Sequence, residues 1–194
     1  MGTTFPNYES PSGRLVKSYL DGAFGANPGD VNPYAASSFY AVDRFASFKI
    51  DPWGKFYRSG GLVVSARYTT SNAIHQAAKL PRDRRESFFK WLSEYEYGLL
   101  GLPEPDAVFY LDIPPEAAAK RVARREAQGG AHRDIHEMYL DYLSGCVDAG
   151  RQAAAYFGWT VVPVTRGDQM VGREEIGEYL YGKIINYIRD GFTS

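Results

Sequence analysis

Three short runs of branched and aromatic residues constrain the fold of this chain more than any other feature of its sequence. They cover Leu62 to Ser65, Ala107 to Ile113 and Thr160 to Thr165, and each is followed by a helical pattern. Runs of this length and composition are typical of buried strands. Strands that alternate with helices pair in parallel and are covered on both faces. The sequence therefore predicts an α/β fold with a parallel sheet sandwiched by helices.

The spacing of apolar residues predicts where the helices lie. Apolar side chains three or four positions apart indicate amphipathic helices over Asp134 to Phe157 and Phe88 to Tyr95. Two further helices are expected from Asn32 through Ser47 and from Glu116 to Glu126. The last helix has isoleucine or leucine at every fourth position from Ile176 to Ile188, and we expect it to close one face of the sheet. The segment Thr3 to Pro6 is interpreted as the tail of a fourth strand.

Bulk composition restricts both the domain organisation and the classes of function. The chain has 194 residues, of which 44% are hydrophobic and 23% charged, and this predicts one domain over 1–194. A formal net charge of -1 argues against nucleic acid or an anionic membrane as a partner. Cys146 lies on an apolar helix stripe and is interpreted as a buried hydrophobe. The three histidines lack nearby cysteines, so we expect no metal held by protein ligands. A single cysteine, and no recognisable signal peptide or bilayer-spanning apolar stretch, lead us to expect a cytoplasmic location.

Arg67 follows directly on a predicted strand, where α/β sheets commonly bind ligands. A guanidinium at this position can hold a phosphate through two parallel hydrogen bonds, which lysine cannot reproduce. An ion pair with a helix carboxylate explains the position equally well. From the residues alone, both interpretations of Arg67 stay open.

Polar and aromatic side chains on two helices form a second set of candidates. Tyr40 and Arg44 are four apart, so both project from one helix face and could stack on a base while bonding its edge. Such a pair more often covers a helix surface. Ser71, Asn72 and Gln76 begin the helix that follows Arg67, where a hydroxyl or amide is more often an N-cap than a ligand contact.

A glycine-rich stretch between two predicted helices indicates a candidate lid over 126–134. Arginines flank this stretch at four positions, namely Arg121, Arg124, Arg125 and Arg133. Arginines on a closing lid can neutralise charge that develops on a transferred phosphoryl group. The alternative is a solvated helix face with local carboxylate partners such as Glu126 and Asp134, which is the commoner use of exposed arginines.

Taken together, these segments resemble the thymidylate kinase family, whose members phosphorylate dTMP to dTDP with ATP and Mg²⁺. The resemblance extends over nearly the whole chain and is specific because several separated motifs occur in the right order. They are Phe5-Pro6-Asn7-Tyr8 with Gly13, the stretch from Tyr40 to Arg44, Arg67 through Gln76, the turn Leu102 to Asp106 leading into Val108 to Pro115, and the arginine lid.

The resemblance assigns a role to each candidate residue. It implies that Tyr40 stacks on thymine, that Arg44 bonds the base edge, and that Arg67 binds the dTMP phosphate. Pocket lining is implied for three residues, namely Ser71, Asn72 and Gln76. It also implies that the lid arginines fold over the ATP phosphates. Arg125 is the first candidate for a contact in the transition state, and Arg124 and Arg133 are the next. Members of the family are usually homodimers, and we expect the same here.

Two departures from the family pattern shape the expectations for this chain. The family places aspartate before the arginine, whereas Ala66 can neither accept a proton nor help to organise Mg²⁺, which should slow phosphoryl transfer by ~100-fold or more. No G-x-x-x-x-G-K-[ST] string occurs between Met1 and Ser194. In the family the first strand is central and the following loop holds ATP.

We therefore expect a P-loop-kinase-like parallel sheet without its first strand and phosphate loop, in which the strands after Leu62 and Ala107 face a gap. Phosphoryl transfer from ATP to dTMP is the leading hypothesis. A non-catalytic nucleotide-binding pseudokinase or partner subunit is the alternative, and a kinase for another nucleotide is a third.

Overall fold

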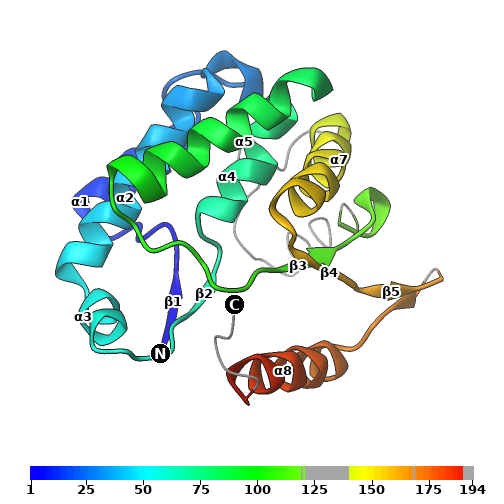
Figure 1. Cartoon of the computed structure of the whole chain (residues 1–194). Helices are drawn as coiled ribbons and strands as arrows, with labels where there is room; N and C mark the ends of the chain where they lie inside the picture. Colours follow the sequence, from blue (N-terminus) through cyan, green and yellow to red (C-terminus); the bar gives the residue numbers. More distant parts are fainter. Residues whose placement is uncertain (119, 121–139, 168, 190–194) are drawn as a thin grey trace.

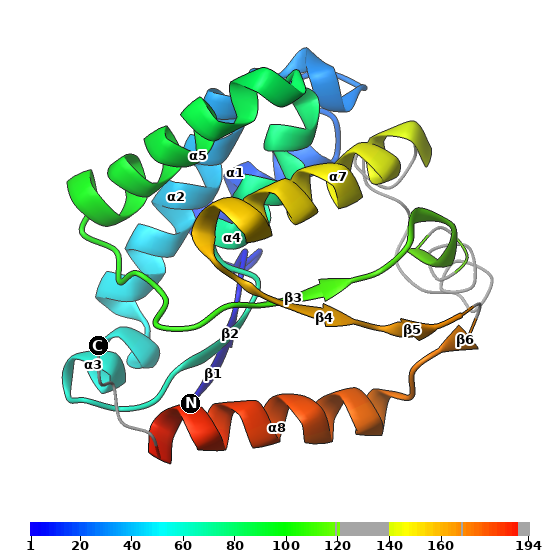
Figure 2. The same ribbon diagram turned by 45° about the vertical axis from the view of Figure 1, so that its right-hand side comes forward.

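The computed structural model of the chain describes residues 1–118, 120, 140–167 and 169–189. The candidate lid over 126–134 and its arginines, Arg121, Arg124, Arg125 and Arg133, lie outside these residues. Figures 1 and 2 show a layer of helices on one side of the strands and the last helix on the other. This arrangement confirms the predicted α/β sandwich.

The first two strands form a parallel pair. Strand β1 (Gly2–Thr4) pairs with β2 (Val64–Ala66), with Gly2 opposite Val64 and Thr4 opposite Ala66. The Thr4 hydroxyl donates to the Ala66 carbonyl at 2.8 Å. The expected fourth strand near Thr3 is therefore present, and it runs beside the strand predicted at Leu62 to Ser65.

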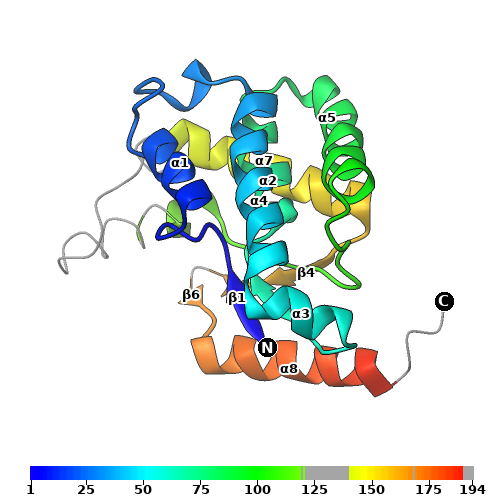
Figure 3. The ribbon, with the colours of Figure 1, turned by 90° about the vertical axis from the view of Figure 1, so that its left-hand side faces the viewer.

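Helices α1 (Pro11–Leu20), α2 (Pro33–Ile50) and α3 (Pro52–Arg58) connect these two strands. Each begins with proline, which suits the first turn because its missing N–H has no partner in a helix there. The side chains of Ser10 and Asn32 accept backbone N–H groups at the starts of α1 and α2. Figure 3 shows α2 between α1 and α5 (Arg85–Ser93), so its residues can reach both neighbours.

A second parallel pair consists of β3 (Phe109–Asp112) and β4 (Thr160–Pro163). Helix α7 (Leu140–Phe157) turns into β4 at Gly158, whose φ of 70° suits glycine. The predicted run Thr160 to Thr165 extends across β4 into β5 (Thr165–Arg166), which forms an antiparallel hairpin with β6 (Gln169–Met170).

The main core lies between the helices of the larger layer. Helices α4 (Thr69–His75) and α5 pack against α7, and the chain between them forms the short turns η2 (Ala77–Lys79) and η3 (Arg82–Arg84). Another short turn, η1 (Pro28–Asp30), precedes α2. The fully buried members of this core are Ala73, Ala77, Phe88, Phe89, Leu92, Ala149 and Ala153. The helix predicted around Phe88 therefore lies on the main core.

The two strand pairs are not hydrogen-bonded to each other in the described part of the chain. Branched apolar side chains on the strands remain accessible, with Val64, Leu111 and Val161 exposed to 49%, 43% and 44%. Backbone groups on the inner edges of β2 and β3 lack a neighbouring strand among the described residues. The gap predicted after Leu62 and Ala107 is therefore confirmed as a sheet in two halves.

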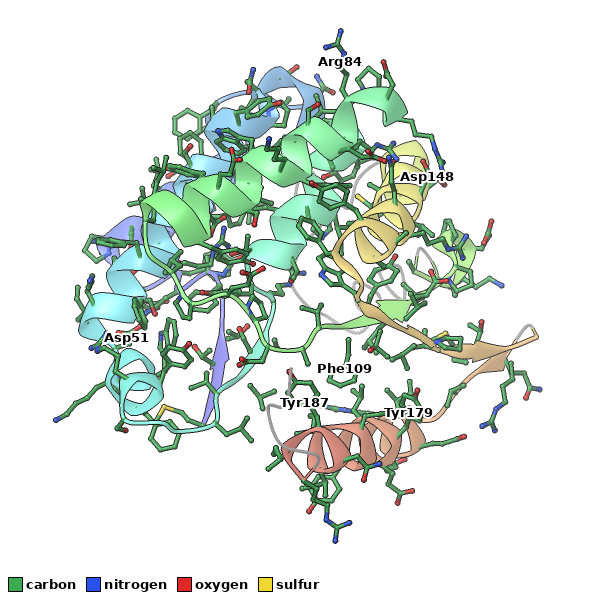
Figure 4. The ribbon with its side chains drawn as sticks, viewed as in Figure 1. Asp51, Arg84, Phe109, Asp148, Tyr179 and Tyr187 are labelled. Atoms are coloured by element: carbon green, nitrogen blue, oxygen red, sulfur yellow. The ribbon has the colours of Figure 1, made fainter. Side chains whose placement is uncertain are left out.

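Helix α8 (Arg173–Arg189) covers the other face of the strands. Figure 4 shows Phe109 of β3 pointing toward α8, near Tyr179 and Tyr187. The Tyr187 hydroxyl donates to the Asp106 carbonyl at 2.9 Å. None of the described residues of α8 is fully buried, so the last helix lies where the sequence predicts but covers its face loosely. No described helix has both the length and the apolar character needed to cross a membrane.

Candidate functional site

Arg44 is buried on α2 and is held by a carboxylate. It is 1% exposed, and its Nε and Nη2 donate to Glu96 Oε2 and Oε1 at 2.7 and 2.5 Å. The Thr69 hydroxyl donates to the same Glu96 Oε2 at 2.9 Å. The interpretation of Arg44 as a residue covering a helix surface is therefore wrong. Its guanidinium is fixed by two parallel hydrogen bonds in the interior.

Glu96 lies in a π-helical turn, η4 (Glu94–Leu99), that continues α5. The wider π turn shifts the facing of the side chains by comparison with an α-helix, and such turns are frequent at functional sites. Glu96 is fully buried at this turn. The helix stops at Gly101, whose φ of 65° is costly for residues with a side chain, and the turn toward β3 follows.

The amide residues of α4 lie beside α2. Asn72 is 2% exposed and its Nδ2 donates to the Ser37 carbonyl at 3.3 Å. Both polar atoms of the Gln76 side chain and the Ser37 hydroxyl are buried without a hydrogen-bond partner among the described residues. Buried polar atoms are normally paired, so these three unpaired atoms on α4 and α2 require an explanation.

The N-cap interpretation of the α4 residues is wrong. The N-cap of α4 is Tyr68, which makes no side-chain capping bond, whereas Ser71 and Asn72 lie inside the helix. Gln76 occupies the C-cap position. Ser71 is half-buried, and Tyr40 on α2 meets the ring of Tyr19 edge-on at 6.3 Å.

Arg67 lies between β2 and α4 and is exposed. Its φ of 71° is in the left-handed region, which residues other than glycine rarely adopt, and its carbonyl accepts the Ser65 hydroxyl at 2.5 Å. No carboxylate in the described part of the chain forms an ion pair with Arg67, so the ion-pair interpretation finds no support there. The guanidinium is available to an anionic ligand.

The two arginines flank the start of α4. Tyr68 follows Arg67, and the Arg44 Cζ lies 5.9 Å from the centre of the Tyr68 ring. Thr69, the next residue, is bonded to Glu96. Burial raises the pKa of the Tyr68 hydroxyl far above its usual value of 10.0, so this group is a neutral donor, and it bonds the Pro103 carbonyl at 2.9 Å.

The pKa of His75 is lowered by its surroundings, including Arg67. Burial lowers the pKa of His75 to about 4, and the charges of Arg67 and Lys79 add to this effect. The imidazole is therefore neutral at pH 7. Its Nδ1 lies 3.5 Å from Cys146 Sγ, and burial raises the pKa of that thiol to about 12. The prediction that Cys146 is a buried hydrophobe is confirmed.

A cavity of about 120 Å³ lies beside the start of α4 and the end of α5. It is lined by Thr69 and Thr70 at the start of α4, by the segment from Glu104 to Val108 before β3, and by Trp159. Ligand pockets are usually larger, at roughly 300 to 1,000 Å³. None of the predicted site residues that the structure describes lines this cavity, so it is separate from the predicted nucleotide site.

Three buried polar residues beside the predicted site were missed by the sequence interpretation: Ser37, Asp43 and Glu96. Asp43 accepts hydrogen bonds from the Asn7 backbone and from the hydroxyls of Ser10 and Ser12. For Glu96 a signal existed, because it lies four residues after Leu92 and eight after Phe88, on the apolar stripe of its helix. A carboxylate on such a stripe needs a partner.

Comparisons with known proteins agree with the motifs. A family model described as thymidylate kinase matches residues 1–148. A thymidylate kinase of Mycobacterium tuberculosis (strain ATCC 25618 / H37Rv) is 30% identical over 163 residues, which cover 81% of this chain and 74% of the relative. The probable thymidylate kinase of Pyrobaculum calidifontis is 27% identical over 74% of this chain and 71% of its own length. That of Caenorhabditis elegans is 31% identical over 60% and 46%.

No group of three or more histidine, cysteine, aspartate or glutamate side chains that could hold a metal occurs among the described residues. The match to the family model covers well over half of the chain, including α2, α4 and both candidate arginines. The chain belongs to the thymidylate kinase family of phosphotransferases, which are nucleoside monophosphate kinases.

Proposed function

We propose that this chain binds dTMP between α2 and α4 as a phosphoryl acceptor. The observation that carries the proposal is the group of unpaired buried atoms on Gln76 and Ser37. A pyrimidine base offers both carbonyl acceptors and an N–H donor, and can satisfy such atoms where no protein group does. Asn72 donates to the Ser37 carbonyl beside them. Tyr40 follows Ser37 by three positions on α2 and provides an aromatic ring.

The charges support an orientation for this ligand. Arg67 is exposed and has no carboxylate partner among the described residues, which suits a phosphate at the surface. Arg44 is buried and already neutralised by Glu96, which suits an uncharged base carbonyl. Ser71, on the exposed side of Asn72, would contact the sugar. The nucleotide would then lie with its base inward and its phosphate toward Arg67.

The reaction proposed is transfer of the γ-phosphoryl group of ATP to a phosphate oxygen of dTMP. ATP and Mg²⁺ are the family's donor and metal. The described residues offer neither a glycine-rich loop nor a cluster of acidic ligands, and Ala66 ends β2 with a methyl group, so we assign roles only on the acceptor side. Arg67, and by resemblance Arg125, Arg124 and Arg133, would neutralise phosphate charge. A cytoplasmic location and a homodimer belong to the same proposal.

Calorimetric titration with dTMP, followed by measurement of ADP release from ATP and dTMP, tests the proposal. We expect dTMP to bind, and Gln76→Leu to weaken binding by about tenfold, which corresponds to about 1.4 kcal/mol. Gln152→Leu on α7 is the matched control, since the Gln152 amide bonds the Arg82 carbonyl away from α4. Binding with ADP release supports a kinase, and binding without it supports the non-catalytic alternative. Absence of dTMP binding, or equal effects of the two substitutions, would contradict the proposal.

A further inference from the structure

Among the described residues, Glu96 is the group that accepts hydrogen bonds from the Arg44 guanidinium. Its side chain is 0% exposed, and its two oxygens accept three hydrogen bonds, two from Arg44 and one from Thr69. A buried carboxylate that accepts two parallel hydrogen bonds from a guanidinium fixes the orientation of that guanidinium. The contact joins three elements that are distant in sequence, because Arg44 lies on α2, Thr69 begins α4 and Glu96 belongs to η4.

The geometry of the pair determines what Arg44 can offer to a ligand. A guanidinium carries five N–H groups, and Glu96 occupies the Nε–H and one N–H of Nη2. Three N–H groups remain, on the edge that faces away from the carboxylate. Because the positive charge is already compensated, this edge is suited to a neutral carbonyl oxygen and poorly suited to compete with Arg67 for a phosphate.

We infer that Glu96 is a positioning residue that aims Arg44 at the C4 carbonyl of a pyrimidine nucleotide, and this inference rests on the proposed function. The C4 carbonyl is on the side of the base opposite the sugar. If the phosphate lies at the exposed Arg67, this carbonyl is the deepest polar atom of the ligand and reaches the buried Arg44. Glu96 also bonds Thr69, so it sets the position of α4, which carries Asn72 and Gln76.

A second buried arginine provides a control that distinguishes a positioning role of Glu96 from a purely structural one. Arg85 is 6% exposed and donates to the Asp148 carboxylate at 2.6 Å, so it is another buried arginine with an acidic partner. Asp148 lies on α7 (Figure 4), away from α2 and η4. Loss of the Asp148 carboxylate removes an arginine partner without disturbing Arg44. Asp148→Asn is therefore the matched control for Glu96→Gln.

The test measures affinity for dTMP and for 5-methyl-dCMP, in which an amino group replaces the C4 carbonyl. In the unmodified protein we expect dTMP to bind at least tenfold more tightly. Glu96→Gln should weaken dTMP binding by about tenfold or more, because an amide has one oxygen and cannot accept both guanidinium N–H groups as the carboxylate does. The affinities for dTMP and 5-methyl-dCMP should then become nearly equal. Glu96→Asp keeps the carboxylate and the ion pair, but its shorter side chain pulls the guanidinium away from the ligand. We expect this variant to lose dTMP affinity and the preference for dTMP in the same direction as Glu96→Gln, but to a smaller extent. Asp148→Asn should leave the preference unchanged within twofold.

The outcomes distinguish this inference from the proposed function. If the unmodified protein binds neither nucleotide, both are wrong. If it binds dTMP and the two Glu96 variants keep the original preference, only the inference is wrong. Equal weakening of both nucleotides by Glu96→Gln, Glu96→Asp and Asp148→Asn would show a structural role and would also overturn it. A narrowed preference confined to the Glu96 variants supports positioning.

Discussion

The surroundings of Arg44 and Arg67 differ in almost every physical respect. Arg44 is buried, lies in a helix and is compensated by Glu96, whereas Arg67 is exposed, has a φ of 71° and has no ion-pair partner among the described residues. The first arrangement makes the arginine part of the fold. The second leaves its charge available and places strain in the backbone at that point. We conclude that burial and an ion pair tie Arg44 to the fold, whereas the charge of Arg67 is left for the phosphate of the proposed ligand.

Replacing Arg44 with alanine should give the largest effect on stability. The substitution leaves the Glu96 carboxylate buried without its partner, which typically costs about 3 to 5 kcal/mol. Arg67→Ala removes an exposed side chain and should change the free energy of unfolding by about 0.5 kcal/mol or less. Urea unfolding of both variants measures the difference. Similar losses in the two variants would mean that burial does not separate the two sites.

The elements could be predicted from the sequence because periodicity and proline placement are local signals. The strands near Leu62, Ala107 and Thr160 and the helices at Asn32 and Ile176 lie where those signals placed them. The gap in the sheet was predicted from the missing phosphate-loop string and the family resemblance, and the structure shows two separate strand pairs. Small offsets, such as β2 beginning at Val64, arise because strand ends depend on pairing.

The partners of the site residues could not be predicted, because they depend on long-range contacts. Arg44 and Glu96 are separated by 52 positions, and nothing in the neighbourhood of Arg44 in the sequence identifies Glu96. The apolar stripe through Phe88 and Leu92 signals that Glu96 needs a partner, but the sequence identifies neither that partner nor the π turn. The left-handed conformation of Arg67 was equally hidden, since only tertiary structure forces an arginine into it.

The pH dependence of stability provides a measurement that involves Arg67, because its charge contributes to the lowered pKa of His75. Because burial and the Arg67 charge lower the pKa of His75 from 6.5 to about 4, the unfolded chain binds a proton before the folded chain does. The contribution of His75 is therefore complete above pH 6.5 and is lost as the pH falls to about 4, by roughly 3 kcal/mol at most.

Unfolding free energies at pH 7 and pH 4.5 measure this loss, and His75→Phe should remove part of it. Arg67→Ala should reduce the loss slightly, since Arg67 is the second cause of the lowered pKa and burial is the first. Arg44→Lys, which keeps a positive charge beside Glu96, serves as the control and should leave the pH dependence of His75 unchanged. If the unfolding free energy fell equally between pH 7 and pH 4.5 in the unmodified protein and in His75→Phe, the pH dependence would belong to other groups.

Replacement of Gln76 tests whether a residue that favours dTMP binding lowers the stability of the free protein. Both polar atoms of its side chain are buried without partners, so Gln76→Leu removes an unsatisfied donor and acceptor while keeping most of the volume. We expect the free energy of unfolding to rise by about 1 kcal/mol, although the same substitution weakens dTMP binding. Thermal unfolding with and without dTMP measures both effects. A lower melting temperature without nucleotide would mean that Gln76 is satisfied in the folded protein.

The smallest expected effect concerns the backbone at Arg67. A left-handed conformation costs a residue with a side chain roughly 1 to 2 kcal/mol, and glycine adopts it without that cost. Arg67→Gly should therefore be more stable than Arg67→Ala by about 1 kcal/mol, although glycine also gains entropy in the unfolded chain, which reduces the difference. Both variants lack the guanidinium, so both should lose dTMP affinity to the same extent. Equal stability of the two would show that the backbone at Arg67 is relaxed, and the contrast with Arg44 would then rest on charge alone.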